Sequence, residues 1–155
     1  MRKWTQLLAL FIGLQLSAQE AEWTSIKDIN PFIGSGGHGH THPSAQAPFG
    51  MIQLGPNTRY DGWDGCGGYH YTDSAMYGFS CTHLSGTGVS DYGDLLILPY
   101  SSPTKEGDHI KFFKEDEHAQ AGYYACILDD GTRIEATAGD RTGILRIRFG
   151  EGSAP

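Results

Sequence analysis

Residues whose side chains could bind a ligand or take part in a reaction are concentrated between positions 30 and 94. This segment holds five of the seven histidines and 14 of the 22 glycines, and it contains no lysine. Glycine reaches positive φ values and lets a backbone approach a ligand closely. Histidine, tyrosine and tryptophan add polar tips on flat apolar bodies. Such loops on a rigid scaffold are typical of a binding site.

Three histidines at alternating positions suggest a metal site as one interpretation. His38, His40 and His42 would point to the same side of an extended segment, where they could hold zinc or copper. The glycines between and before them argue against a regular strand. We therefore favour histidines that contact a ligand or brace a loop, and we expect no metal site in this chain.

Two catalytic patterns are weak in the same segment. The glycine-rich run at 34–39 lacks the Gly-Lys-Ser/Thr ending of a phosphate-binding loop. A Ser–His–Asp triad drawn from His83, Ser85 and Asp91 has no Gly-x-Ser-x-Gly nucleophile elbow beside it. Neither pattern predicts catalysis by this chain.

Aspartates and aromatic residues offer a more specific hypothesis, which is sugar binding. A glycosidase needs two carboxylates at a defined separation, although most aspartates in loops make turns and caps. Flat aromatic faces beside hydrogen-bonding groups suit stacking on a sugar ring. Trp63, between Gly62 and Asp64, is the aromatic residue that we expect to be exposed. For Tyr69 and Tyr71, a place in the core and a place in the sugar site are equally consistent with the sequence.

The fold prediction comes from short apolar runs separated by turn residues. An Asp-Asp-Gly turn at 129–131 lies between two β-rich runs and predicts a hairpin. Gly55-Pro56-Asn57 is a turn signal. No long amphipathic helix is evident, so we expect an all-β antiparallel β-sandwich. The expected strands cover residues 49–54, 69–71, 76–80, 94–100, 122–128, 132–138 and 141–149.

The amino terminus has the pattern of a secretory signal peptide. Arg2 and Lys3 precede an apolar stretch at 7–16 and the small residues Ser17 and Ala18. We expect residues 1–18 to be cleaved and the protein to be exported to the periplasm or the extracellular space. The apolar stretch is too short for a membrane span. The formal net charge of −7 and the lack of a basic run make nucleic acid a poor partner.

Several motifs in order resemble the amino-terminal domain of glycoside hydrolase family 92, and the likeness covers essentially everything after residue 18. The family motif has His at the position of Cys81, an aromatic residue at that of His42, and often Trp at that of Gly65. The matching stretches are NPFIGSGGHGH (30–40), APFGMIQLGPNTR (47–59), GWDGCGGYHY (62–71), GFSCTHLSGTG (78–88), DYGDLLILP (91–99) and the run from 115 to 149.

The resemblance implies an exo-acting, inverting, calcium-dependent α-mannosidase with an amino-terminal β-sandwich and a helical (α/α)6 domain. The general acid, the general base and the calcium ligands would lie in the helical domain. Residues 19–155 would then be an incomplete β-sandwich domain that packs against it. By the same likeness, the backbone of Gly36 and Gly37 would approach the terminal mannose and Trp63 would line the next subsite. His38 and Asp64 complete the expected substrate-binding set.

We therefore expect the chain to be the substrate-lining part of an α-mannosidase that hydrolyses terminal α-linked mannose from glycans. Alone, it should bind sugar weakly and have no catalysis. The alternative is a stand-alone carbohydrate-binding module, and a third possibility is a structural domain without a ligand. The pairing of Cys66, Cys81 and Cys126 stays open, and we favour three buried thiols over a bridge.

Overall fold

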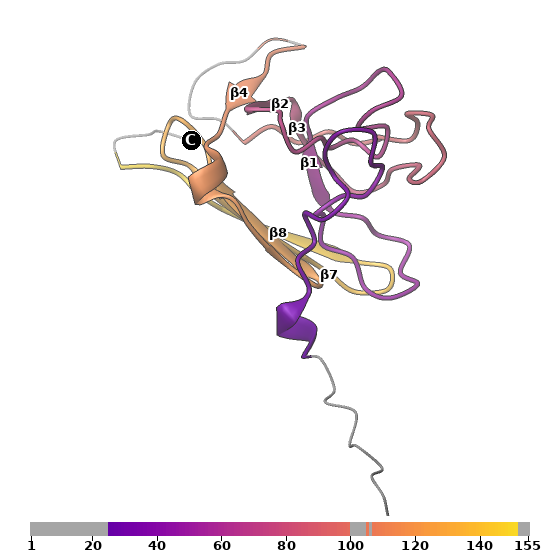
Figure 1. Ribbon diagram of the computed structural model, residues 1–155. Coiled ribbons are helices and arrows are strands. Elements are labelled where there is room, and N and C mark those ends of the chain that lie inside the picture. The colour runs from indigo at the N-terminus through magenta and orange to yellow at the C-terminus, as the bar shows by residue number, and fades with distance from the viewer. Residues whose placement is uncertain (1–24, 100–104, 106, 152–155) are drawn as a thin grey trace, which may run out of the picture.

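The regular structure of the protein is almost entirely β-strand (Figure 1). The computed structural model describes residues 25–99, 105 and 107–151. The helical elements among these residues are two single turns of 3-10 helix, η1 (Ile26–Asp28) and η2 (Lys114–Asp116). Within the same ranges, no helix has the length and apolar character needed to span a membrane. The predicted signal peptide at residues 1–18 lies outside the described residues.

Four consecutive strands form one antiparallel sheet in chain order. They are β5 (His118–Gln120), β6 (Tyr123–Ile127), β7 (Arg133–Ala138) and β8 (Gly143–Arg148). Cys126 lies opposite Ile134, so the apolar positions of neighbouring strands share one face. Gly131, at φ +81°, closes the β6–β7 hairpin and donates its amide to the Leu128 carbonyl at 2.9 Å. The three predicted strands between 122 and 149 are confirmed.

Two short antiparallel ladders gather beside this sheet in Figure 1. The ladders pair β1 (Gly55–Asn57) with β3 (Gly78–Ser80) and β2 (Ala75–Met76) with β4 (Ile110–Lys111). The strand predicted at 76–80 is therefore interrupted at Tyr77. The turn predicted at 55–57 is wrong, because these residues form β1. Pro56 is tolerated there because strand positions at an edge do not need its missing N–H.

Two other predicted strands, at 49–54 and 69–71, do not form. Phe49 adopts φ +58°, which breaks an extended segment at its first residue. The amide of Met51 then bonds to the Asp140 carbonyl at 2.7 Å, and the amide of Gln53 bonds to the Cys81 carbonyl at 2.9 Å. Hydrogen bonds to separate segments replace a ladder, and Leu54 keeps only an isolated bridge to Ala45.

The apolar run at 94–100 predicts a buried strand, and its described part, residues 94–99, contradicts this. Leu95 is 73% exposed and adopts φ +52°, which interrupts the extended backbone. Ile97 alone pairs, as an isolated bridge to Phe79. An apolar composition without a regular backbone therefore does not produce a strand here.

The hydrophobic core fills the space between the large sheet and the two ladders. Phe79 on β3 packs against Tyr124 on β6 with ring centroids 5.9 Å apart, and both side chains are fully buried. Burial of large apolar side chains is the main force that holds two β layers together. Met76, Ile110, Phe112, Leu128, Ile134 and Ala136 complete the centre of this core. This arrangement confirms the prediction of an all-β antiparallel β-sandwich.

A buried polar cluster ties the large sheet to the preceding loops. The Glu117 carboxylate accepts hydrogen bonds from the Tyr124 hydroxyl at 2.8 Å, the Tyr69 hydroxyl at 3.0 Å and the Lys114 Nζ at 2.9 Å. Burial raises the pKa of both tyrosines, and the Glu117 charge adds to the effect. Both phenols therefore stay protonated and keep donating to the carboxylate.

We expect Phe79→Ala to lower the free energy of unfolding by about 3–5 kcal/mol, because it leaves a cavity between the two layers. Phe79→Leu should cost less, since it retains most of the buried volume. Urea denaturation monitored by circular dichroism measures both values. Phe113→Ala is the control, because this ring is exposed and its loss should cost less than about 0.5 kcal/mol. Equal losses at positions 79 and 113 would contradict the assigned core.

Candidate functional site

Three loops, at residues 34–42, 58–73 and 81–94, meet on one side of the sandwich. The His38 Nδ1 lies 2.9 Å from Asp64 Oδ1, which joins the first loop to the second. The His40 ring meets the Trp63 ring edge-on at 4.8 Å between centroids. Gly88 of the third loop lies so close to Trp63 that a Cβ atom there would overlap the indole. The five predicted substrate-binding residues, Gly36, Gly37, His38, Trp63 and Asp64, thus come from two loops in contact.

The turn at Gly36 and Gly37 presents bare backbone. Gly37 adopts φ +59°, and a Cβ atom built on it would meet no atom within 4 Å. The turn is closed by the amide of Gly39, which donates to the Gly36 carbonyl at 3.0 Å. Gly39 has no room for a side chain, because the Gly34 carbonyl occupies that space. On the side where a Cβ atom would point, the Gly37 backbone is therefore open to a ligand, since only its own chain neighbours are near.

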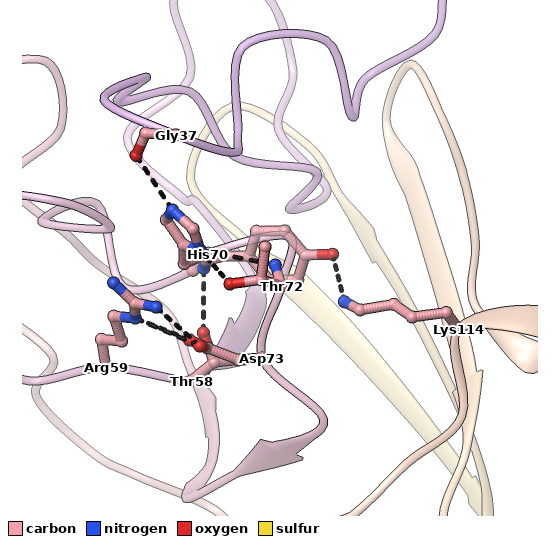
Figure 2. Close-up of polar contacts among 8 residues, drawn as sticks. Gly37, Thr58, Arg59, His70, Thr72, Asp73 and Lys114 are labelled. Atoms are coloured by element: carbon pink, nitrogen blue, oxygen red, sulfur yellow. Dashed lines mark hydrogen bonds and ion pairs between the residues drawn. The ribbon is translucent and has the colours of Figure 1, made fainter.

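His70, to which sequence reasoning gave no role, holds this turn in place (Figure 2). Its Nε2 lies 3.0 Å from the Gly37 carbonyl oxygen. Because a carbonyl only accepts, Nε2 must carry the proton, and Nδ1 accepts from the Thr72 hydroxyl at 2.9 Å. The backbone amide of His70 also donates to Thr58 Oγ1 at 2.9 Å. His70 therefore fixes the first loop against the second.

An ion pair between Arg59 and Asp73 stabilises the second loop. Arg59 donates to Asp73 through Nε at 2.9 Å and through Nη2 at 2.8 Å, and Figure 2 shows the two side chains end to end. Bidentate pairs of this kind are strong and geometrically specific. Gly65 lies against the same elements at φ +72°, and a Cβ atom added to it would lie 3.0 Å from both Arg59 Cδ and His70 Cβ. A large residue at position 65 would need these neighbours to move.

Trp63 projects from the second loop, as the sequence predicts. It is 62% exposed, whereas Tyr69 is 1% exposed and belongs to the core. Tyr71 is 46% exposed, so the two tyrosines that composition left undecided separate clearly. The indole contacts the His40 ring and lies against Gly88, and much of its surface stays exposed. An exposed indole offers a flat apolar surface to a ligand.

His38 and Asp64 form a pair at the exposed rim. The side chain of His38 is 91% exposed and that of Asp64 is 32% exposed. The hydrogen bond from His38 lowers the pKa of Asp64, so this carboxyl is an acceptor at neutral pH. Sequence reasoning named both residues but not their contact, because 26 positions separate them. Because Nδ1 donates to Asp64, the Nε2 of the neutral His38 ring and the second Asp64 oxygen are both hydrogen-bond acceptors beside the Gly37 turn.

Two other histidines, His42 and His83, are partly buried and neutral at pH 7. Burial lowers the pKa of His42 and of His83 to about 4. The His83 ring bonds to Ser80 Oγ and to the side-chain oxygen of Asn57, rather than to Ser85 as a triad would require. The triad drawn from the sequence therefore finds no support in the hydrogen bonds of His83.

Metal-binding side chains do not cluster among the described residues. No group of three or more His, Cys, Asp or Glu side chains in the described ranges is placed to hold a metal ion. Cys66, Cys81 and Cys126 are all free thiols.

Acidification should destabilise the protein through its partly buried histidines. In an unfolded chain these rings titrate near 6.5, while the folded pKa of His42 and His83 is about 4. The unfolded state therefore binds more protons between these values. Their contribution to stability is complete above pH 6.5 and is lost as the pH falls toward 4. Thermal melts at pH 7, 6, 5 and 4.5 measure the effect.

The variant His42→Phe separates this cause from the titration of carboxylates. It removes one titrating ring, and it also removes a buried Nδ1 that has no partner among the described residues. We expect a weaker fall of the melting temperature below pH 6.5. His118→Phe, at an exposed position, should leave the slope unchanged. An unaltered slope in His42→Phe would rule out His42 as a source.

Known proteins of one glycosidase family match this chain in sequence and in fold. The profile of the "Glycosyl hydrolase family 92 N-terminal domain" matches residues 28–155. The solved GH92 α-mannosidase BT3965 of Bacteroides thetaiotaomicron superposes with a TM-score of 0.76 at 38% identity, over 83% of this chain and 19% of that one. The GH92 inverting mannosidase BT2199 of B. thetaiotaomicron VPI-5482 gives 0.71 at 29% identity, over 82% and 18%.

A curated relative extends the likeness over nearly the whole chain. An uncharacterized secreted glycosidase of Arthroderma benhamiae is 27% identical over 162 residues, which cover 98% of this chain and 21% of that protein. The chain thus spans about one fifth of the length of the relatives that it matches. The resemblance inferred from the sequence motifs is confirmed: the chain belongs to glycosyl hydrolase family 92 and matches its N-terminal domain.

Proposed function

We propose that this chain is the amino-terminal, substrate-lining portion of an exo-acting, inverting α-mannosidase that removes terminal α-linked mannose from glycans. The observation that carries the proposal is the open Gly37 backbone beside the exposed Trp63 ring, in a domain of family 92. Two solved relatives named as mannosidases support the substrate class, and one of them is named as inverting.

In this proposal each site residue has one role. The backbone at Gly36 and Gly37 approaches the terminal mannose, where side chains would prevent contact. His38 and Asp64 hydrogen-bond to sugar hydroxyls through their exposed polar atoms. Trp63 stacks on the next sugar ring or the leaving group. His70 acts as a positioning residue, because it touches the turn at Gly37 and not the ligand.

The catalytic carboxylates belong to another part of the enzyme in this proposal. An inverting glycosidase uses one carboxylic acid to protonate the leaving oxygen and one carboxylate to activate water on the opposite face. Asp64 is engaged with His38, and Asp73 is engaged with Arg59. We therefore assign the general acid and the general base, together with the calcium ligands, to a carboxy-terminal helical domain that packs against these loops. No step through calcium is assigned to the residues of this chain.

We also propose that the protein is exported from the cytoplasm. The pattern at residues 1–18 and the secreted relative both support a protein that acts on glycans in the periplasm or outside the cell. The formal charge of −7 disfavours nucleic acid as a partner.

The first test is mannose release by the protein expressed from its complete reading frame. We expect release of free mannose from α-mannosides, and loss of that release when a calcium chelator is added. Addition of calcium should restore it. Binding of mannosides without any release would instead identify a carbohydrate-binding module. Neither binding nor release would leave a structural domain.

Trp63→Ala should weaken binding of α-mannobiose about tenfold, a free-energy loss of about 1.4 kcal/mol, because it removes the stacking surface. Isothermal titration of the catalytically blocked protein measures the change. Phe113→Ala is the matched control, since it deletes an exposed ring elsewhere on the surface. Unchanged affinity in Trp63→Ala would remove this residue from the proposed subsite.

A further inference from the structure

A hollow lies among the loops at 58–73 and 81–94, and none of the five predicted substrate-binding residues lines it. It has a volume of about 230 Å³ and lies between Asn57, at the end of β1, and the loop segment at residues 90–94. One water molecule occupies about 30 Å³ in the liquid, so the hollow has room for more than a single water.

Three buried polar atoms in the residues that line this hollow have no hydrogen-bond partner within 3.5 Å in the described part of the chain. They are Asn57 Nδ2, His83 Nδ1 and Ser90 Oγ. Asn57 is 1% exposed, and its Nδ2 faces Gly93, 3.5 Å from where a Cβ atom would lie. Unpaired polar atoms are costly to bury, so such atoms in native sites generally meet water or a ligand.

The available donors and acceptors match hydroxyl groups. The Nε2 of His83 contacts the Asn57 side-chain oxygen, which only accepts, so Nε2 carries the proton and Nδ1 keeps a lone pair. Asn57 Nδ2 donates, and the Ser90 hydroxyl does both. Burial, which lowers the pKa of His83 to about 4, keeps this ring neutral at pH 7. A ligand with several hydroxyls satisfies all three atoms, since each hydroxyl both donates and accepts.

The charges around the hollow disfavour an anion. Its guanidinium, on Arg59, is already paired with Asp73, and Asp91 and Asp94 both line the wall. The rings of Tyr60 and Tyr92 also contribute to the lining, and both are partly exposed. Neutral hydrogen-bonding atoms beside aromatic faces are the features that suit a sugar ring.

We propose that this hollow is a further sugar subsite, which takes a neutral pyranose ring of the glycan away from the Gly37 turn. The inference rests on the proposed glycan-binding function and adds a second place of contact to it. One loop serves both places, because Gly88 lies against Trp63 and Ser90 lines the hollow. A chain of several sugars can therefore be held at its terminal ring and at a more distant ring.

Gly93→Leu is the substitution that fills the subsite. Gly93 does not have a left-handed backbone, and its added Cβ would lie in ordinary contact with Asn57 Nδ2 at 3.5 Å and Tyr60 Cε1 at 3.8 Å. Gly139→Leu is the matched control in the β7–β8 turn, where a Cβ atom would lie 3.5 Å from Thr142 Oγ1. Ser90→Ala is a second variant, because it deletes an unpartnered hydroxyl with little effect on packing.

The experiment uses the protein from its complete reading frame and two kinds of probe. Isothermal titration measures the affinity for methyl α-mannopyranoside and for thio-linked α-mannotrioses with 1,2, 1,3 or 1,6 linkages, which resist hydrolysis. We expect Gly93→Leu to weaken mannotriose binding about tenfold, because its side chain fills the subsite. Ser90→Ala should weaken it about threefold, as expected for one lost hydrogen bond. The loss should be smaller for the monosaccharide, and Gly139→Leu should match the wild type. Thermal melts verify that each variant is folded.

The outcomes separate this inference from the proposed function. Wild-type mannotriose affinity in folded Gly93→Leu and Ser90→Ala would overturn the subsite, while mannose release would still support the enzyme. Variant-sensitive binding without mannose release would keep the subsite and overturn the mannosidase proposal. A wild-type protein that binds none of the probes would overturn both.

Discussion

The hydrogen bond from the His70 ring to the Gly37 carbonyl is the contact on which the candidate site depends. The loops of the site have almost no regular secondary structure, so side-chain to backbone bonds replace the ladders that position a strand. Gly37 has a left-handed backbone and open space around it, and glycine has more conformational freedom to lose than any other residue. A fixed partner for its carbonyl is therefore what makes this backbone a defined binding surface.

That contact is anchored to the sheet through Tyr69, the residue that precedes His70 in the chain. Tyr69 is buried in the core, and its hydroxyl donates to Glu117, which also accepts from Tyr124 on β6. Lys114 balances the carboxylate, so the buried charge is paired. The path from β6 through Glu117 and Tyr69 to His70 lets an antiparallel sheet, formed by local hairpins, set the position of a turn more than 80 residues earlier in the chain.

Sequence reasoning succeeded where the determinants are local. The Asp-Asp-Gly turn and the alternation on both sides of it define the β6–β7 hairpin within a few residues, and the exposure of Trp63 follows from its polar neighbours. It failed at 55–57, 49–54 and 94–99, where hydrogen bonds to distant segments or positive φ values decide the backbone. The His38–Asp64 contact and the hub at His70 were missed for the same reason, because each joins loops 26 or more positions apart.

The charges of the site are arranged so that it presents neutral or acidic groups. Arg59 is paired with Asp73 and Lys114 with Glu117, while His42 and His83 are kept neutral by burial. An anionic ligand would find no unpaired guanidinium or ammonium within these clusters, whereas hydroxyls can bond to the backbone, the amide and the hydroxyl groups that remain. The sugar specificity suggested by the family is thus consistent with the electrostatics of the loops. Because the 81–94 loop touches both Trp63 and Asn57, the two proposed contact regions share one wall, and the spacing between them is set by that loop.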